Sequence, residues 1–202
     1  QAEQEEVRLG GVSVLVNLSS GYESSSLPVL ASDVELIVRL LLVGRYGAGW
    51  QAHPVDGATR FKARRVAALS LLMAHVAARD GEKIKPKDKD AMVRRIEKRI
   101  GGSSNLGVLL NQCGASQLDL EYWITNFMLA RIQLGYLEEQ VEPPDPTELE
   151  AMFNKGNHPF GDADFEQVKE EYQSYVMDAG LRDVLKEWVD GVLIQGKVIF
   201  SQ

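Results

Sequence analysis

The chain has 202 residues, of which 45% are hydrophobic and 25% charged, which is typical of one medium-sized or two small globular domains. Its formal net charge of -7 argues against nucleic-acid binding, and the basic runs 83–89 and 94–99 contain no aromatic residues and are interpreted as solvated faces. No membrane span is expected, because the longest apolar run, "VELIVRLLLV", is broken by Arg39 and is about half the length that a spanning helix needs.

The chain is expected to begin with strands. Val12–Leu18 is apolar and β-branched, lies between two glycines and a Ser/Gly-rich turn, and therefore predicts a strand. A short second strand is expected after Pro28, ending at Ser32. Ser32 and Glu35 form a capping-box pattern, in which a hydroxyl and a carboxylate satisfy the first amides of a helix. This pattern predicts a helix over about 33–43.

Most of the remaining chain is predicted to be helical. After a glycine-rich loop at 44–59, apolar residues at helical spacing predict helices over about 60–80, 84–100, 105–113, 118–141, 148–154 and 164–193. Gly81 and Gly101 are expected to end the first two of these. Capping-box patterns are expected at Ser116 with Asp119 and at Thr147 with Glu150, and Gly180 is expected to kink or divide the last helix.

The chain is expected to end with a short strand, Lys197–Phe200. Such a strand needs a partner for its backbone donors and acceptors, and Val12–Leu18 is the best candidate in the chain. The predicted fold class is therefore mainly α, with a small β-sheet formed by the N-terminal and C-terminal strands. The long chain between the two strands does not prevent this pairing, because the entropic cost of closing a loop grows only slowly with its length.

Residues that could carry chemistry are scattered. Cys113 is the single cysteine, so no internal disulfide is expected, and its place before a glycine at a helix end favours a buried spectator thiol. The histidines do not have metal-ligand spacing with each other or with Cys113, and there is no phosphate-binding loop between a strand and a helix and no nucleophile elbow. We therefore expect no catalytic residue, no metal and no cofactor, and we interpret the chain as a binding protein rather than an enzyme.

Two groups of residues are candidates for peptide binding. The first is an aromatic and Met-containing band on one predicted helix, comprising Tyr122, Trp123, Phe127, Met128 and Ile132. Such side chains adapt to varied apolar partners, but the alternative interpretation, that the band is simply core, stays open. The second group is Tyr46 and Trp50 in the glycine-rich loop, which are either accessible or folded down over the helices.

The order of these segments resembles the SurA-like periplasmic chaperones, from about Val12 onward. "SDVELIVRLLLVG" after an apolar strand resembles the opening of that family, and "VAALSLLMAHVAARDGEKIKPKDKDAMVRRIEKRI" resembles its next two helices. "LGVLLNQCGASQLDLEYWITNFMLARIQLGYLEEQVEPPDPTELEAMF" is similar to the stretch that follows. "FEQVKEEYQSYVMDAGLRDVLKEWVDGVLIQGKVIF" looks like the family's C-terminal helix and returning strand.

This resemblance implies a single chaperone domain over 1–202, completed by the helix and strand at 164–202. It also implies a periplasmic location and an ATP-independent holdase whose clients are unfolded or extended polypeptides, including outer-membrane proteins. The parvulin prolyl isomerase domains of the family have no room in the interval 154–163, so isomerase activity is not expected. The alternative function is a non-catalytic scaffold or assembly subunit for one folded partner, and a homo-oligomer is compatible with either.

Overall fold

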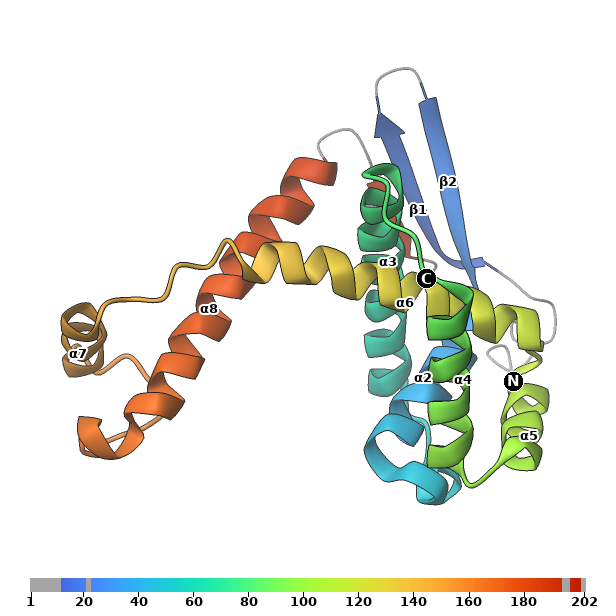
Figure 1. Ribbon diagram of the computed structural model, residues 1–202, viewed down its shortest axis with the longest axis horizontal. Coiled ribbons are helices and arrows are strands. Elements are labelled where there is room, and N and C mark those ends of the chain that lie inside the picture. Colours follow the sequence, from blue (N-terminus) through green and yellow to red (C-terminus); the bar gives the residue numbers. More distant parts are fainter. Residues whose placement is uncertain (1–11, 21–22, 194–196, 201–202) are drawn as a thin grey trace. The chain divides into compact units, whose positions relative to one another are not determined.

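The computed structural model of the chain describes residues 12–20, 23–193 and 197–200. The chain divides into two compact units, which we call the main unit (residues 1–133 and 195–202) and the small unit (residues 134–194). Figure 1 shows the elements of each unit. The fold is mainly α with a small sheet, as predicted. That residues 1–202 act as one chaperone domain stays a prediction.

The sheet joins the two ends of the chain. β1 (Val12–Ser20) lies in the middle, with β2 (Glu23–Leu30) and β3 (Lys197–Phe200) antiparallel on either side. In the β1–β3 ladder, Val14 stands opposite Phe200 and Asn17 opposite Lys197, which confirms the predicted pairing. The prediction of a short second strand after Pro28 is wrong in extent, because the strand already begins at Glu23. The serines at 24–26 have low strand propensity, but the pairing with β1 makes this segment a strand.

Helices form the rest of the main unit. They are α2 (Ala31–Tyr46), the 3₁₀-helix η1 (Gly47–Ala52), α3 (Gly57–Arg79), α4 (Pro86–Ile100), α5 (Ser103–Cys113) and α6 (Gln117–Glu138), the last of which continues into the small unit. Gly101 ends α4 in the left-handed conformation, which costs glycine least. The fully buried side chains Val14 and Val16 of β1 share a core with Leu36 of α2 and Leu71 of α3.

Three predicted helix caps have different outcomes. The Ser116–Asp119 box is confirmed: the backbone amide of Ser116 donates to Asp119 Oδ2 over 2.7 Å, and the amide of Asp119 donates to Ser116 Oγ over 3.2 Å. The Ser32–Glu35 box is wrong, because α2 already begins at Ala31 and Asp33 Oδ2 accepts the amide of Leu30 over 2.8 Å.

Glu35 does not cap α2. It is buried and pairs with Arg60 of α3, with 2.6 Å between Oε1 and Nε.

The predicted Thr147–Glu150 box is also wrong. Asp145 caps α7 (Pro146–Asn154) by accepting the amides of Thr147 and Glu148. Pro146 has no amide proton to satisfy, so the helix starts there, earlier than the predicted box.

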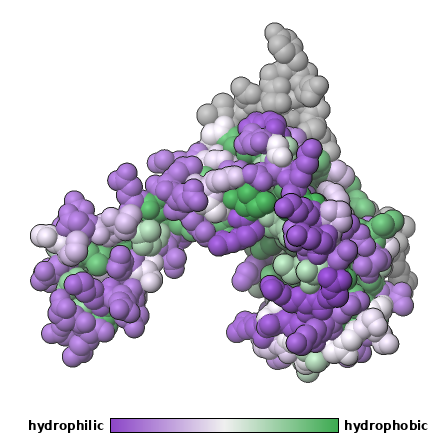
Figure 2. Space-filling model, viewed as in Figure 1, coloured by the Kyte–Doolittle hydropathy of each residue, from purple (hydrophilic) through white to green (hydrophobic). Residues whose placement is uncertain are grey.

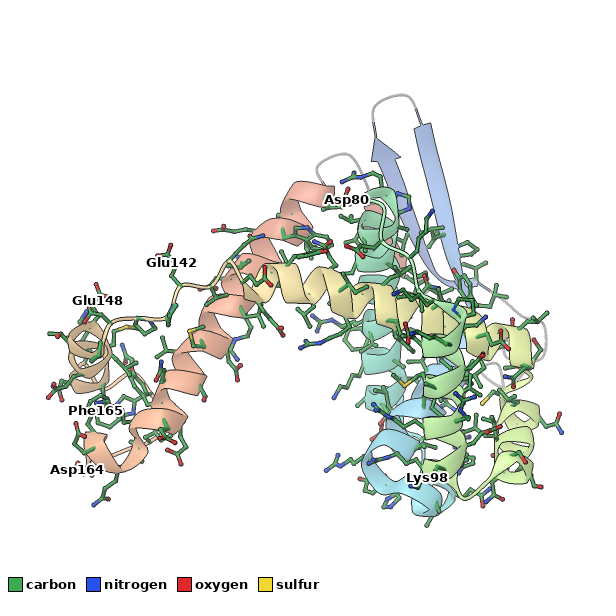
Figure 3. The ribbon with its side chains drawn as sticks, in the orientation of Figure 1. Asp80, Lys98, Glu142, Glu148, Asp164 and Phe165 are labelled. Atoms are coloured by element: carbon green, nitrogen blue, oxygen red, sulfur yellow. The ribbon has the colours of Figure 1, made fainter. Side chains whose placement is uncertain are left out.

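The small unit is built on an aromatic cluster. Phe153 of α7 and Tyr172 of α8 (Phe165–Leu193) are buried with Leu149, and their rings meet edge to face at 5.0 Å. The cluster lies between α7, which carries Glu148, and the start of α8 at Phe165 (Figure 3).

Gly180 does not divide α8, which runs unbroken from Phe165 to Leu193. A Cβ atom at this position would lie 2.9 Å from Val141 Cγ1. The glycine therefore serves close packing: it lets the segment after α6 approach the helix within the small unit.

Candidate binding groove

An open groove of about 700 Å³ lies in the main unit between α2, α4 and α6. Its floor consists of buried apolar side chains, Ile37 and Val43 of α2 and Ile124 of α6. Its walls are half-buried apolar side chains: Leu40, Leu41, Val66, Ile84, Met92, Ile96, Phe127, Met128 and Ile132. Because so many large apolar side chains are only half-buried, the three helices do not pack into a closed core here but leave an open groove.

Polar contacts and burial hold α4 at both of its ends. At its C-terminal end Ile100 is fully buried, and Arg99 Nε donates to the carbonyl oxygen of Val43 over 2.9 Å. The guanidinium of Arg99 also donates to the carbonyl of Gly44, so it caps the C-terminal turns of α2 with a positive charge, where the helix dipole favours one. Between the two ends, Met92 and Ile96 face the groove.

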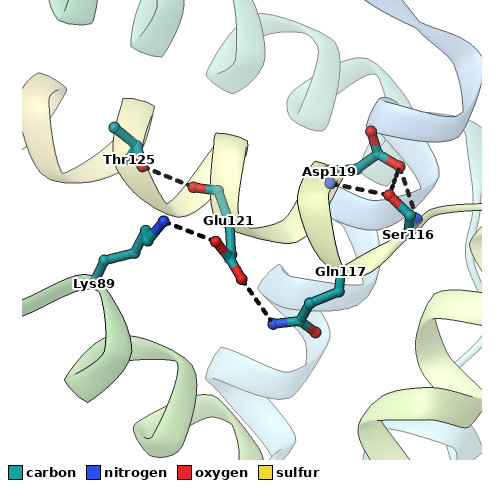
Figure 4. Close-up of polar contacts among 6 residues, drawn as sticks. All are labelled: Lys89, Ser116, Gln117, Asp119, Glu121 and Thr125. Atoms are coloured by element: carbon teal, nitrogen blue, oxygen red, sulfur yellow. Dashed lines mark hydrogen bonds and ion pairs between the residues drawn. The ribbon is translucent and has the colours of Figure 1, made fainter. Parts of the chain in front are cut away.

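The N-terminal end of α4 is tied to α6 by an ion pair (Figure 4). Lys89 Nζ lies 2.7 Å from Glu121 Oε2, and Gln117 Nε2 donates to Oε1 of the same carboxylate over 3.4 Å. Two hydrogen bonds lower the pKa of Glu121, and the one from Lys89 has a larger effect than the one from Gln117. The hydrogen bond between Lys89 and Glu121 also raises the pKa of Lys89. The pair thus holds the wall of the groove at a set distance from α6 while both groups are charged.

The rim of the groove is basic. Five cationic side chains line it, against the single carboxylate of Asp88: Lys83, Lys85, Arg95, Arg99 and Arg131. The charge of the rim is therefore positive, whereas the net charge of the whole chain is -7. In Figure 2, green hydrophobic surface along α6 borders purple hydrophilic surface over α4.

The structure separates the predicted aromatic band into three parts. Phe127, Met128 and Ile132 line the groove. Trp123 is fully buried and donates through Nε1 to Asp33 Oδ1 over 2.9 Å, so it belongs to the core, which was the alternative interpretation. Tyr122 is 48% exposed and does not line the groove. Five residues spread over so many helical turns cover more than one face of α6.

The second predicted group, in the glycine-rich loop, does not line the groove either. Trp50 is only 2% exposed, and the guanidinium of Arg39 lies 5.5 Å from its ring. Tyr46 stacks on His53 with 3.4 Å between the ring centroids. Trp50 therefore serves as core, and Tyr46 as part of a local surface contact.

Sequence reasoning missed the groove residues of α2 and α4. Leu40 and Leu41 follow Ile37 and Val38 in a helix with more apolar residues than one buried face needs. Met92 and Ile96 form the apolar stripe of a helix that is otherwise strongly charged. The sequence signal for a groove was therefore twofold: α2 has more apolar residues than its buried face needs, and α4 has only a narrow apolar stripe.

Metal-ligand clusters, membrane-spanning helices and a reactive thiol are not found among the described residues. No three His, Cys, Asp or Glu side chains gather there as a metal site would need, and no helix there has the length and apolar character to cross a membrane. Burial raises the pKa of the Cys113 thiol to about 12, so the thiolate is scarce at neutral pH. A comparison with protein-family models gives no match for this chain, and a comparison with curated proteins gives none.

Proposed function

We propose that the protein is an ATP-independent holdase that binds unfolded or extended polypeptide segments in the groove between α2, α4 and α6. The observation that carries this proposal is the groove itself, an open hollow of about 700 Å³ whose walls are large, half-buried apolar side chains. The resemblance to SurA-like chaperones supports it from the sequence, and with it a periplasmic location and outer-membrane protein clients are proposed.

The chemistry of the groove suits an apolar polypeptide segment. Covering its walls would remove apolar surface from water, at about 25 cal/mol per Å² buried. Ordering a flexible client opposes this gain, so affinity should be modest. Met92, Met128 and Phe127 are side chains that adapt to partners of different shape, which a holdase with many clients requires.

The test is suppression of aggregation of a denatured β-barrel protein, followed by light scattering without nucleotide. We expect the wild type to suppress scattering and a Met128→Gln/Ile132→Gln variant to suppress it much less. Glutamine is close to methionine in size and favours helices, so the variant removes apolar character from the groove with little change in shape.

The matched control is Leu118→Gln/Tyr122→Gln on the same helix. Leu118 is 76% exposed and neither residue lines the groove, so this variant should suppress scattering as the wild type does. Equal loss in both variants would place the client site outside the groove. A wild type that suppresses nothing but binds one folded protein would favour the scaffold function instead.

A further inference from the structure

The segment that leads into α4 is built to present charge beside the groove. Ile84 packs against the buried side chains of Ala74, Ala77 and Leu129, and the amide of Glu82 donates to the carbonyl of Ala77 over 3.0 Å. Because Ile84 is anchored, its exposed neighbours in the chain, Lys83 and Lys85, are held at the rim.

A third cation extends the rim along α4. Arg95 is exposed, lines the groove and lies one turn from Met92. Among the residues that the structure describes, the side chains of Lys83, Lys85 and Arg95 form no ion pair, in contrast to Lys89, which is bound to Glu121. Three cations therefore stand beside an apolar hollow with their charge available to a ligand.

We propose that the groove selects polypeptide segments whose apolar centre is flanked by aspartate or glutamate. This inference rests on the proposed holdase function and adds the charge class of the client to it. The apolar centre fills the hollow, and the flanking carboxylates meet Lys83 and Lys85 at one border and Arg95 at another. Segments with basic flanks are repelled by the same side chains, so the rim excludes them as well as attracting acidic ones.

The experiment uses three synthetic peptides with one common apolar centre of Leu, Tyr, Val and Phe and flanks of Asp/Glu, Ser or Lys. Binding to the full chain is measured by fluorescence anisotropy with an uncharged dye. We expect the acidic peptide to bind about threefold to tenfold more tightly than the serine peptide, and the lysine peptide to bind least. In about 1 M salt the three affinities should converge, because the Debye length shrinks to about 3 Å.

The decisive variant is Lys83→Glu/Lys85→Glu/Arg95→Glu, in which the order of the three peptides should reverse. The matched control, Lys62→Glu/Lys87→Glu/Lys98→Glu, changes the net charge by the same amount at exposed positions outside the groove and should keep the wild-type order. Lys98 lies on α4 itself (Figure 3). Circular dichroism melts of both variants establish that they fold.

The outcomes separate the inference from the function on which it rests. Equal affinity of the wild type for all three peptides would overturn the charge selection and leave the holdase function standing. The same reversal in both variants would trace the effect to net charge and would also overturn it. Absence of binding of every peptide, together with no suppression of aggregation, would contradict the holdase function itself.

Discussion

Replacing Trp123 with phenylalanine should destabilise the main unit without weakening the groove. Trp123 Nε1 donates to Asp33 Oδ1 over 2.9 Å, and Oδ2 of that carboxylate accepts the amide of Leu30 over 2.8 Å at the start of α2. The indole thus fixes the carboxylate that caps α2. The ring centroids of Trp123 and the groove residue Phe127 are 5.7 Å apart, so a phenylalanine at position 123 keeps an aromatic ring beside Phe127 while it removes the hydrogen bond to Asp33.

The magnitude follows from the two interactions that are lost. A hydrogen bond to a charged group contributes about 1.5–3 kcal/mol. The smaller ring leaves a partly empty site, and since full truncation of a buried aromatic residue costs about 3–5 kcal/mol, the phenylalanine should lose about 1 kcal/mol of packing. We therefore expect the free energy of unfolding to fall by about 2.5–4 kcal/mol, which lowers the urea midpoint by about 1.2–2 M for a slope near 2 kcal/mol per M.

The assay is urea unfolding followed by far-ultraviolet circular dichroism, since tryptophan fluorescence would change with the substitution itself. Tyr122→Phe, at the exposed neighbouring position, is the control and should shift the midpoint little. Peptide affinity of the folded Trp123→Phe protein should equal that of the wild type. An unchanged midpoint would refute the assignment of Trp123 as the residue that fixes the cap of α2.

Three further predictions concern the sheet, the small unit and the support of α4. Deleting residues 196–202 should lower the melting temperature by several degrees, because β1 loses the pairing along one edge; an unchanged melting curve would count against the sheet. Gly180→Ala should destabilise the small unit, although alanine favours a helix by about 1 kcal/mol, because its Cβ would lie 2.9 Å from Val141 Cγ1; Val141→Ala should restore stability, and a stabler single variant would contradict this. Glu121→Gln should be less stable than the wild type at neutral pH. In the folded protein the pKa of Glu121 lies below its ordinary value of 4.5. The stability that the ionised carboxylate contributes is therefore complete above pH 4.5 and is lost as the pH falls through the lowered pKa of the folded state. Urea midpoints of both proteins across the acid range should converge, and a constant gap would disprove the role of the pair with Lys89.

The sequence predicted those elements whose signals are local. Gly101 was expected to end α4, and it does so in the structure. The terminal strand pairing was also predictable, because a short strand at 197–200 needs a partner and Val12–Leu18 was the best one available. Where two capping residues compete, local patterns mislead: Asp33 rather than Ser32 caps α2, because Asp33 also receives the indole of Trp123, ninety residues away in the sequence.

The site was predictable only in part, for a geometric reason. Periodicity finds the apolar residues of a helix but does not tell a core-facing side chain from one beside a hollow. Thus Trp123, Phe127 and Met128 belong to one sequence pattern, whereas one is core and two line the groove. The opposite wall depends on how Arg99 and Lys89 fasten α4, and these are contacts between segments far apart in the chain.

The most direct test of the account is photo-cross-linking from within the groove. A benzoyl-phenylalanine placed at Met128 should cross-link to a denatured β-barrel client in the absence of nucleotide, and an excess of unlabelled apolar peptide should compete. The same group at Leu118, exposed on the same helix, should give little product. Efficient cross-links from Leu118 and none from Met128, with both proteins folded, would contradict the claim that the groove holds the client.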